Sequence, residues 1–376
     1  KYKIPASKGN QPRNIDLSLV PYAEGISYSK NEFYPGELIQ LNDPYILRDF
    51  RGQVVQFNPF QYNPVTEELK VYHNLKVKIV FNERDAKNPI YTKSEALKPT
   101  LDFNHIYKNH FLNYTNSTRY TPISEDGEML VICYDSFMDA MEPFVEWKNQ
   151  KGIKTTMVPK SEAGSNYTSI KNYIEDFYNS HNLAFVLLVG DISQIPAIST
   201  GSGWSSGESD PWYSYMSGND SYPEFFVGRF SAENISHVNT QVERSIEYER
   251  DPQTGASWYR KGVMVASNEG AGAGDDGEAD WQHARNMRLD LMQYTYLVVD
   301  EMYDGTHGGN DANGNPNSTL LKNALNDGRS ILHYTGHGET TNLVTTNFST
   351  SHVNQLVIFS ITPLHFQLAR MVCLRH

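Results

Sequence analysis

The pattern of apolar and polar positions along the chain changes near residue 119. Before that point the apolar residues form short runs at Glu37–Leu41, Gln53–Phe57 and Leu75–Ile79, and the last of these alternates with period two. Turns rich in proline, asparagine and glycine separate the runs, and a helical period does not extend beyond a few turns. Short strands between such turns are typical of a β-sandwich. The sequence therefore predicts that residues 1–119 form an all-β domain of the sandwich type.

A polar stretch, Asn113–Pro122, follows and has the composition of a linker. From residue 128 onward, apolar runs of strand length alternate with segments of helical period. This alternation predicts an α/β domain from residue 120, with an open, mostly parallel sheet covered by helices on both faces. Strands are predicted at 129–133, 154–158, 185–189, 225–227, 263–266 and directly before His337, and helices at 135–151, 169–178, 233–249, 279–293 and 318–327.

Composition and charge exclude several classes of function. The 376 residues carry a formal net charge of −12 without a basic stripe, so a nucleic-acid backbone is a poor partner. No apolar stretch reaches the length of a transmembrane helix. The two cysteines, Cys133 and Cys373, are too few for a disulfide framework or a cysteine-based zinc site. Because the chain begins with Lys1 rather than methionine, we expect that a signal peptide has been removed or that the chain is a fragment.

The most informative short segment is Tyr334–Gly338, which reads Tyr-Thr-Gly-His-Gly and follows the apolar pair Ile331 and Leu332. A histidine between two glycines, just past a short strand, lies on a tight turn at the carboxyl end of that strand. Open α/β sheets place their chemistry at this edge, and glycine lets the backbone approach a ligand closely. His337 is therefore a candidate functional residue. The alternative is a surface histidine in a glycine-rich loop.

Acidic residues gather in two other loops. Asp191 directly follows Gly190 at the end of a predicted strand, where it is either functional or a turn and capping residue. In segment 218–224, the carboxylates of Asp220 and Glu224 and the carbonyl of Tyr222 crowd oxygen ligands into one turn. Such a set suits Ca²⁺, and a solvated acidic loop is the alternative.

A further loop, 270–277, is flanked by Glu269 and Asp280. Asp280 stands near a helix N-terminus, where it either complements the helix dipole or binds an arginine or lysine side chain. Glu278 and His283 are separated by roughly 140° around an ideal helix. They can share a metal ion only if the helix begins between them.

Five segments of the α/β part carry a resemblance to a known family. They are Phe144–Gly152, Val186–Asp191, Phe226–Ser231, Tyr334–Gly338 and Phe348–Leu356. In their order and spacing the chain resembles the gingipains, cysteine peptidases of a caspase-like fold, from about Tyr120 to Leu356. Residues 1–119 resemble the β-rich propeptide of that family.

The resemblance implies a cysteine endopeptidase precursor that cleaves protein and peptide substrates after arginine. His337 would be the general base that activates a cysteine thiolate, and then the acid that protonates the leaving amine. Glu269 would orient the imidazole. Asp280 would lie at the base of the S1 pocket and bind the P1 arginine through two hydrogen bonds.

Structural Ca²⁺ is a second implication of the resemblance. One ligand set would be Asp191, Glu278 and His283. The other would comprise the carbonyls of Ser217 and Tyr222 together with the carboxylates of Asp220 and Glu224.

The family also implies processing and location. Arg119 precedes Tyr120, whose surroundings resemble the start of the mature enzymes. An arginine-specific enzyme would thus cut its own chain at this point and release a propeptide that otherwise acts as an inhibitor. The implied location is outside the cell or at the cell surface of a Bacteroidetes-type bacterium.

The family pattern after Leu356 is a hydrophobic strand that ends in Ala-Cys, and that cysteine is the nucleophile. Residues 357–376 form instead a divergent tail, in which Cys373 lies beyond the usual histidine-to-cysteine spacing. Cys373 is either the nucleophile or a tail residue. We expect a changed reading frame or a truncated gene here, so that residues 120–356 are an incomplete catalytic domain. The alternatives are a catalytically inactive homologue and a surface binding module that uses the β-rich N-terminal region.

Overall fold

The computed structural model describes residues 3–6, 8, 19–80, 87–90, 100–114, 127–201, 207–269, 278–339 and 341–356. The chain divides into two compact units. The first unit contains residues 1–135, 148–199 and 208–231, and the second contains residues 136–147, 200–207 and 232–376. Each unit is described by itself below.

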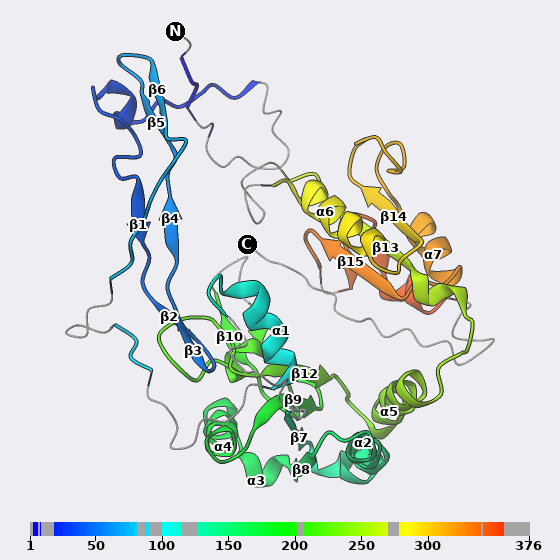
Figure 1. Cartoon of the computed structure of the whole chain (residues 1–376). Helices are drawn as coiled ribbons and strands as arrows, with labels where there is room; N and C mark the ends of the chain where they lie inside the picture. The colour runs from blue at the N-terminus through cyan, green and yellow to red at the C-terminus, as the bar shows by residue number, and fades with distance from the viewer. Residues whose placement is uncertain are drawn as a thin grey trace. The chain divides into compact units, whose positions relative to one another are not determined.

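The N-terminal region, within the first unit, forms antiparallel strand pairs (Figure 1). Strand β1 (Ile39–Leu41) pairs with β4 (Val55–Phe57), β2 (Tyr45–Leu47) with β3 (Phe50–Gly52), and β5 (Phe60–Asn63) with β6 (Glu68–Val71). The β-rich character of this region is therefore confirmed. Two details differ from the sequence prediction. Residues Leu75–Ile79 form no strand, and a helix, α1 (Leu101–His110), stands in a region expected to be all β.

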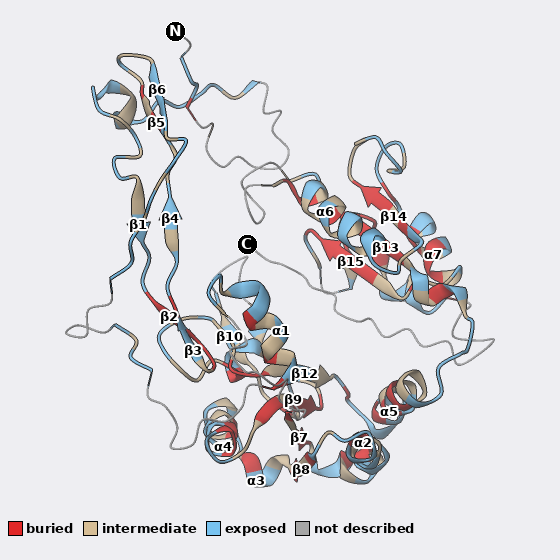
Figure 2. Ribbon diagram, viewed as in Figure 1, coloured by how far each residue is buried: buried red, intermediate tan, exposed pale blue. Residues whose placement is uncertain are grey.

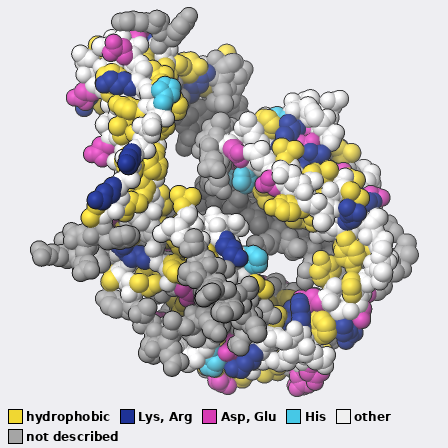
Figure 3. Space-filling model, in the orientation of Figure 1, with side chains coloured by type: hydrophobic (Ala, Val, Ile, Leu, Met, Phe, Trp, Pro, Cys, Tyr) yellow, Lys and Arg dark blue, Asp and Glu magenta, His cyan; other side chains and the backbone are white. Residues whose placement is uncertain are grey.

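Most of this region exposes its apolar side chains. Leu41 and Phe57 on the β1–β4 pair and Phe60 on β5 are each about half exposed or more, at 65%, 48% and 58%, and Figure 3 shows apolar side chains along these strands. The β2–β3 hairpin is different, since all three residues of β2 are buried (Figure 2). A small aromatic core holds the hairpin. It contains Tyr45, Leu47, Phe103 and Tyr107, with Ile106, Phe111, Tyr114, Tyr222 and Phe226 packed against them.

A four-stranded parallel sheet forms the α/β part of the first unit, in the order β12–β9–β7–β8. The strands are β7 (Glu128–Cys133), β8 (Thr155–Pro159), β9 (Leu183–Val189) and β12 (Phe226–Phe230). Helices α3 (Lys160–Ala163) and α4 (Tyr167–Ser180) pack on the sheet through one apolar core. In α4 the apolar residues Ile170, Ile174 and Phe177 recur at helical spacing, and the Asn166 side chain accepts a hydrogen bond from Ser169 N at 3.0 Å to cap the helix.

The second unit contains a three-stranded parallel sheet in the order β14–β13–β15. Its strands are β13 (Lys261–Ala266), β14 (Val298–Tyr303) and β15 (Ile331–Thr335). Helix α6 (Asp280–Gln293) packs with Met264, Ala266 and Tyr303, and α7 (Ser318–Asn326) packs with Val263, Val265 and Leu332. Because neighbouring residues of a strand face opposite sides, the two helices cover opposite faces of this sheet.

The remaining elements lie outside the two parallel sheets. Helices α2 (Met138–Gln150) and α5 (Ile235–Arg250) belong mainly to the second unit. The others are η2 (Ile26–Ser29), η3 (Asp135–Phe137), β10 (Ile198–Thr200), β11 (Gly207–Ser209), η5 (Pro211–Tyr213), η6 (Ser257–Arg260), β16 (Asn342–Leu343), β17 (Phe348–Ser349) and α8 (Thr350–Val353). None of the helices in the described ranges is long and apolar enough to cross a membrane.

Parallel strands and covering helices agree with the α/β prediction, and each predicted strand and helix after residue 128 has a counterpart. The sequence missed β14, in which Asp300 and Glu301 interrupt the apolar run. It also gave no sign that the parallel strands form two sheets rather than one.

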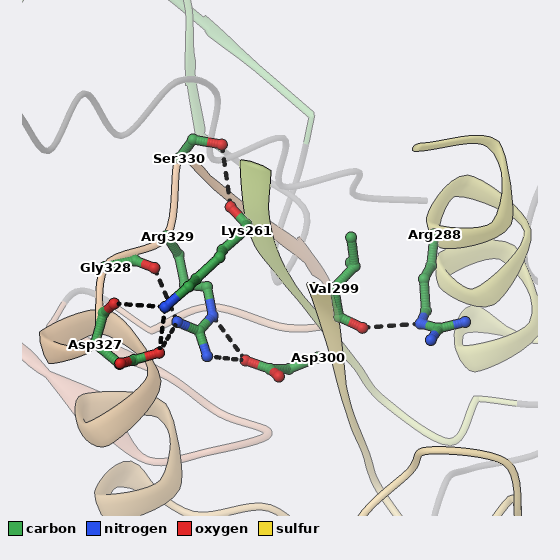
Figure 4. A network of polar contacts seen from close by, with 8 residues as sticks. All are labelled: Lys261, Arg288, Val299, Asp300, Asp327, Gly328, Arg329 and Ser330. Atoms are coloured by element: carbon green, nitrogen blue, oxygen red, sulfur yellow. Dashed lines mark hydrogen bonds and ion pairs between the residues drawn. The ribbon is translucent and has the colours of Figure 1, made fainter. Parts of the chain in front are cut away.

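The amino ends of the strands in the second sheet are joined by a polar network (Figure 4). The buried Arg329 guanidinium donates to Asp300 Oδ2 through Nε at 2.8 Å and to Asp327 Oδ2 through NH1 at 2.8 Å. Lys261 Nζ, at the start of β13, donates to the same Asp327 oxygen at 3.0 Å. This end of the sheet lies opposite the strand ends that carry His337, so the network is structural.

We predict that Arg329→Met lowers the free energy of unfolding by about 2 kcal/mol, because the Asp300 carboxylate, 28% exposed, would lose the buried guanidinium that pairs with it. The control is Lys261→Met, which removes a cation from the exposed side of Asp327 and should cost about 0–1 kcal/mol. Chemical denaturation measures both values. Equal losses in the two variants would contradict the structural role given to Arg329.

Candidate active site

The parallel register of β13 and β15 brings two loops to the same edge of the second sheet. Ala266 lies opposite Thr335, and Ser267 N donates to Thr335 O at 2.9 Å. Glu269 follows β13 and His337 follows β15, so both side chains emerge at the carboxyl edge. His337 Nε2 lies 3.2 Å from Glu269 Oε1. The side chains are 56% and 27% exposed, respectively, so the imidazole is open to solvent while its carboxylate partner is half-buried.

The backbone of the His337 turn is fixed by a buried tyrosine. Tyr334 Oη donates to the carbonyl of His337 at 2.6 Å and lies 3.1 Å from Thr345 Oγ1. Val344 N donates to the same carbonyl at 3.0 Å. A Cβ at Gly336 would lie 3.0 Å from both Tyr334 Oη and Thr345 Oγ1, which is closer than ordinary packing allows. Glycine at position 336 therefore lets the turn sit directly on this tyrosine.

Asp280 is joined to the same edge through Ser267. Asp280 is the first residue of α6, only 3% exposed, and its Oδ2 accepts a short hydrogen bond from Ser267 Oγ. Ser267 Oγ in turn accepts from Glu269 N at 3.3 Å, and Asp280 N donates to Glu269 O at 3.3 Å. The helix N-terminus and the serine hydroxyl both favour a carboxylate here. A buried anion thus lies beside the His337–Glu269 pair, as binding of a cationic side chain would require.

Three of the predicted site residues lie outside the described residues: Cys373, Arg119 and Tyr120. The other cysteine, Cys133, closes β7 and is fully buried. Burial raises the pKa of the Cys133 thiol to about 12. Cys133 is accordingly a core residue, as the sequence pattern indicated, and its thiol is unsuited to nucleophilic chemistry.

The predicted second calcium set lies on one loop of the first unit. Glu224 is fully buried, and its Oε2 accepts from Met216 N at 2.6 Å and from Ser217 N at 3.2 Å. Glu224 Oε1 is buried without a hydrogen-bond partner, and burial raises the pKa of this carboxyl to about 7. Asp220 Oδ1 accepts from Tyr222 N at 3.0 Å. An unpartnered buried carboxylate oxygen next to a second carboxylate fits a hard cation.

The predicted first calcium set is divided between the two units. In the second unit, α6 begins at Asp280, between Glu278 and His283, and His283 Nδ1 lies 3.2 Å from Glu278 Oε2. Glu278 and His283 therefore meet the condition for sharing a metal ion, because the helix begins between them. Asp191 belongs to the first unit, where its Oδ1 accepts from Ser231 Oγ at 3.1 Å. No group of three or more His, Cys, Asp or Glu side chains positioned to hold a metal ion occurs among the residues that the structure describes.

Sequence reasoning missed three residues that hold these loops. Ser267 links Asp280 to Glu269, and its place just after a strand was the available signal. Arg229 donates to both oxygens of Asp210 and to the carbonyls of Gly190 and Ile195, at 2.7–2.9 Å, and so fixes the turn that carries Asp191. Arg48, in the N-terminal region, reaches the carbonyl of Glu224 at 2.6 Å. Arg229 lies within the family motif Phe226–Ser231, whereas no periodicity or motif marked Arg48.

The family of the chain follows from comparison with known proteins. The model of peptidase family C25 matches residues 123–369, and the model of the C25 propeptide matches residues 1–120. The chain belongs to peptidase family C25, and it carries the propeptide region of that family. The family match continues beyond Leu356, where the sequence motifs placed the end of the similarity.

Individual relatives agree with this assignment. The chain is 38% identical over 372 residues to Gingipain R1 of Porphyromonas gingivalis, covering 97% of this chain and 36% of the relative. Two solved structures are each 36% identical in sequence to the chain. One is the complex of P. gingivalis RgpB pro- and mature domains (TM-score 0.54, 61% of this chain and 52% of that chain), and the other is the Arg specific cysteine proteinase gingipain R (TM-score 0.55, 63% and 53%). The chain thus spans about a third to a half of these relatives.

We predict that Cys133 resists thiol reagents in the folded protein. With a thiol pKa of about 12, only about 10⁻⁴ of the molecules carry the thiolate at about pH 8, and the side chain is also buried. Iodoacetamide treatment followed by peptide mapping should leave Cys133 unmodified, whereas the same treatment in guanidinium chloride should modify it fully. Rapid native modification at Cys133 would show that β7 opens to solvent.

Proposed function

We propose that this protein is the precursor of a cysteine endopeptidase that cleaves peptide bonds after arginine. The observation that carries the proposal is the contact of His337 with Glu269, at 3.2 Å, beside the buried carboxylate of Asp280. Membership of peptidase family C25 supports it. The solved relative described as an Arg specific cysteine proteinase supports the specificity.

In the proposed mechanism, Glu269 accepts a hydrogen bond from Nε2–H of His337 and leaves Nδ1 as the nitrogen that takes the thiol proton. The thiolate then attacks the carbonyl carbon of the scissile bond, and His337 returns the proton to the leaving amine. Cys133 is buried in the core and unsuited to the role of nucleophile, and we propose that Cys373 supplies the thiolate. Water hydrolyses the resulting thioester and frees the enzyme.

Asp280 supplies the specificity in this proposal. An arginine side chain at P1 would pair its guanidinium with the carboxylate, and the low exposure of Asp280 makes that pairing stronger than it would be in water. The same preference explains the proposed processing site. Arg119 precedes Tyr120, so an active molecule would recognise its own chain there and release the N-terminal region.

The N-terminal region is proposed to act as a propeptide that inhibits the enzyme before processing. Strand β2 of its β2–β3 hairpin is buried in an aromatic core shared with Tyr222 and Phe226 of the α/β part, which supports this role over that of a surface module for another partner. Relatives from P. gingivalis carry the gingipain name, and by resemblance we propose secretion or display at the cell surface. The net charge of −12 is consistent with protein substrates rather than nucleic acid.

Structural calcium is also proposed at two places. Asp220, Glu224 and the carbonyls of Ser217 and Tyr222 would hold one ion, and the unpartnered Oε1 of Glu224 supports it. Glu278 and His283, which are in contact within the second unit, would supply ligands to the other. A bound ion would neutralise the clustered carboxylates, and no chemical step passes through it.

We predict that an arginine-directed chloromethyl ketone alkylates Cys373, and that His337→Ala slows this labelling about 10³-fold because the thiol loses its base. Glu269→Gln should slow it about ten-fold, since an exposed pair contributes less than a buried one. His352→Ala, at another histidine of the second unit, is the control and should label normally. Rates come from intact mass and peptide mapping. Complete absence of labelling in the unaltered protein would favour the catalytically inactive homologue.

We predict that Asp280→Asn lowers kcat/KM for peptides with arginine at P1 by about 10–100-fold, the value of a charge-assisted hydrogen bond. Self-cleavage between Arg119 and Tyr120, read from the new N-terminus, should slow to the same extent. Asp290→Asn, on the exposed side of the same helix, is the matched control. Unchanged cleavage of arginine peptides by the Asp280 variant would remove this residue from the S1 pocket.

A further inference from the structure

One arginine of the N-terminal region is buried in the α/β part of the first unit. The side chain of Arg48 is 3% exposed. Its NH1 donates to the carbonyls of Leu183 and Glu224, each at 2.6 Å, and its NH2 donates to Asn182 Oδ1 at 3.1 Å. The guanidinium also lies over the Phe103 ring, with Cζ 4.7 Å from the ring centroid. A buried cation with this many directed donors is an anchor, because its removal would leave several acceptors unpaired.

The backbone of Arg48 adopts a conformation that is unfavourable for a long side chain. Arg48 is the first turn residue of the β2–β3 hairpin and has a φ of 48°, in the left-handed region that favours asparagine and glycine. A long side chain in that position loses backbone stability relative to asparagine. The contacts of the guanidinium with Leu183, Glu224 and Asn182 offset this loss.

The hairpin touches the loop 217–224 at several points. Ile46 N donates to Asp220 Oδ2 at 2.8 Å, and the rings of Tyr45 and Tyr222 stack with centroids 4.2 Å apart. The backbone of Gly218, at a φ of 79°, lies beside the hairpin, because a Cβ there would be in ordinary contact with Ile46 Cβ at 3.5 Å. With the bond from Arg48 to the Glu224 carbonyl, the hairpin therefore contacts the loop from Gly218 to Glu224 and holds it at Asp220 and Glu224.

These are the same residues that carry the proposed cation ligands. Asp220 uses one oxygen for Ile46 N and the other for Tyr222 N, so each carboxylate oxygen keeps a lone pair for a metal ion. The buried Glu224 Oε1 has no hydrogen-bond partner and keeps both of its lone pairs. The hairpin thus holds the loop in place without consuming its ligand atoms.

We propose that docking of the β2–β3 hairpin and binding of Ca²⁺ to the loop 217–224 strengthen each other. This inference rests on the proposed calcium site. Each event orders the same loop, so whichever comes second no longer bears that ordering cost, and the coupling is reciprocal by thermodynamic linkage. Calcium would therefore tighten the hold of the N-terminal region on the α/β part of the first unit. Removal of calcium would favour its release once the chain has been cut.

The first experiment is calorimetric titration of the full chain with Ca²⁺. The Ca²⁺-binding event at this loop is the one that the Glu224→Gln variant lacks. Arg48→Asn removes the anchor but suits the turn, and it should weaken this event at least five-fold, within the usual range of allosteric coupling of about 5–150-fold. The matched control is Arg51→Asn on the same hairpin. Arg51 bonds the carbonyls of Lys87 and Asn88, and its variant should stay within about two-fold of the parent.

A second measurement needs no variant. Hydrogen exchange in the unaltered full chain should show that Ca²⁺ slows exchange of the Ile46 amide and its neighbours in the hairpin, while the amides of the β5–β6 pair exchange as before. Equal or tighter calcium binding by Arg48→Asn, or hairpin exchange unaffected by Ca²⁺, would overturn the coupling and leave the calcium site standing. If the unaltered chain and Glu224→Gln bind Ca²⁺ in the same way, the proposed calcium site is wrong, and the coupling is wrong with it.

Discussion

The parallel register of β13 and β15 is the constraint on which the candidate active site depends. Ala266 lies opposite Thr335, and Ser267 continues the ladder by donating to the Thr335 carbonyl. A slip of one residue would turn the side chains of β15 to the other face. It would also move His337 along the edge relative to Glu269 and break the 3.2 Å contact. The register is protected because both faces of this sheet are buried, one under α6 and the other under α7.

The role of a charged side chain in this protein depends on how deeply it is buried. His337 is open to solvent, as a group that meets a substrate must be, Glu269 beside it is half-buried, and Asp280 is buried and held by Ser267. Arg48, Arg229 and Arg329 are deeper, and each fixes carbonyls or carboxylates at the end of a sheet or on a loop. A guanidinium suits this task because its donors are rigid and planar and stay charged when buried. In the loop 217–224, the buried Glu224 keeps an unpartnered carboxylate oxygen, and its backbone carbonyl accepts from Arg48.

The sequence patterns were most successful where a single element decides its own structure. Continuous apolar runs identified β7, β9 and β13, which are buried on both faces, and helical periodicity identified α4 and α5, which bury one face. It failed for β14, where Asp300 and Glu301 interrupt the apolar run and are compensated by Arg329 and Arg285 from other elements. It also failed for residues 75–79, whose alternation is that of a strand although they pair with no neighbour among the described residues. In β14, partners distant in sequence decided the outcome.

The sequence by itself determined the α/β character, the place of His337 at a strand end and the family resemblance, because local apolar spacing and contiguous motifs carry that information. Only the tertiary structure decided that Glu269 contacts His337, that Ser267 connects Glu269 to Asp280, and that Arg48 reaches the Glu224 carbonyl 176 positions away. These contacts depend on strand register, on the start of α6 and on the docking of a hairpin. Each of those is set by packing between segments far apart in the chain, which no local pattern of residues encodes.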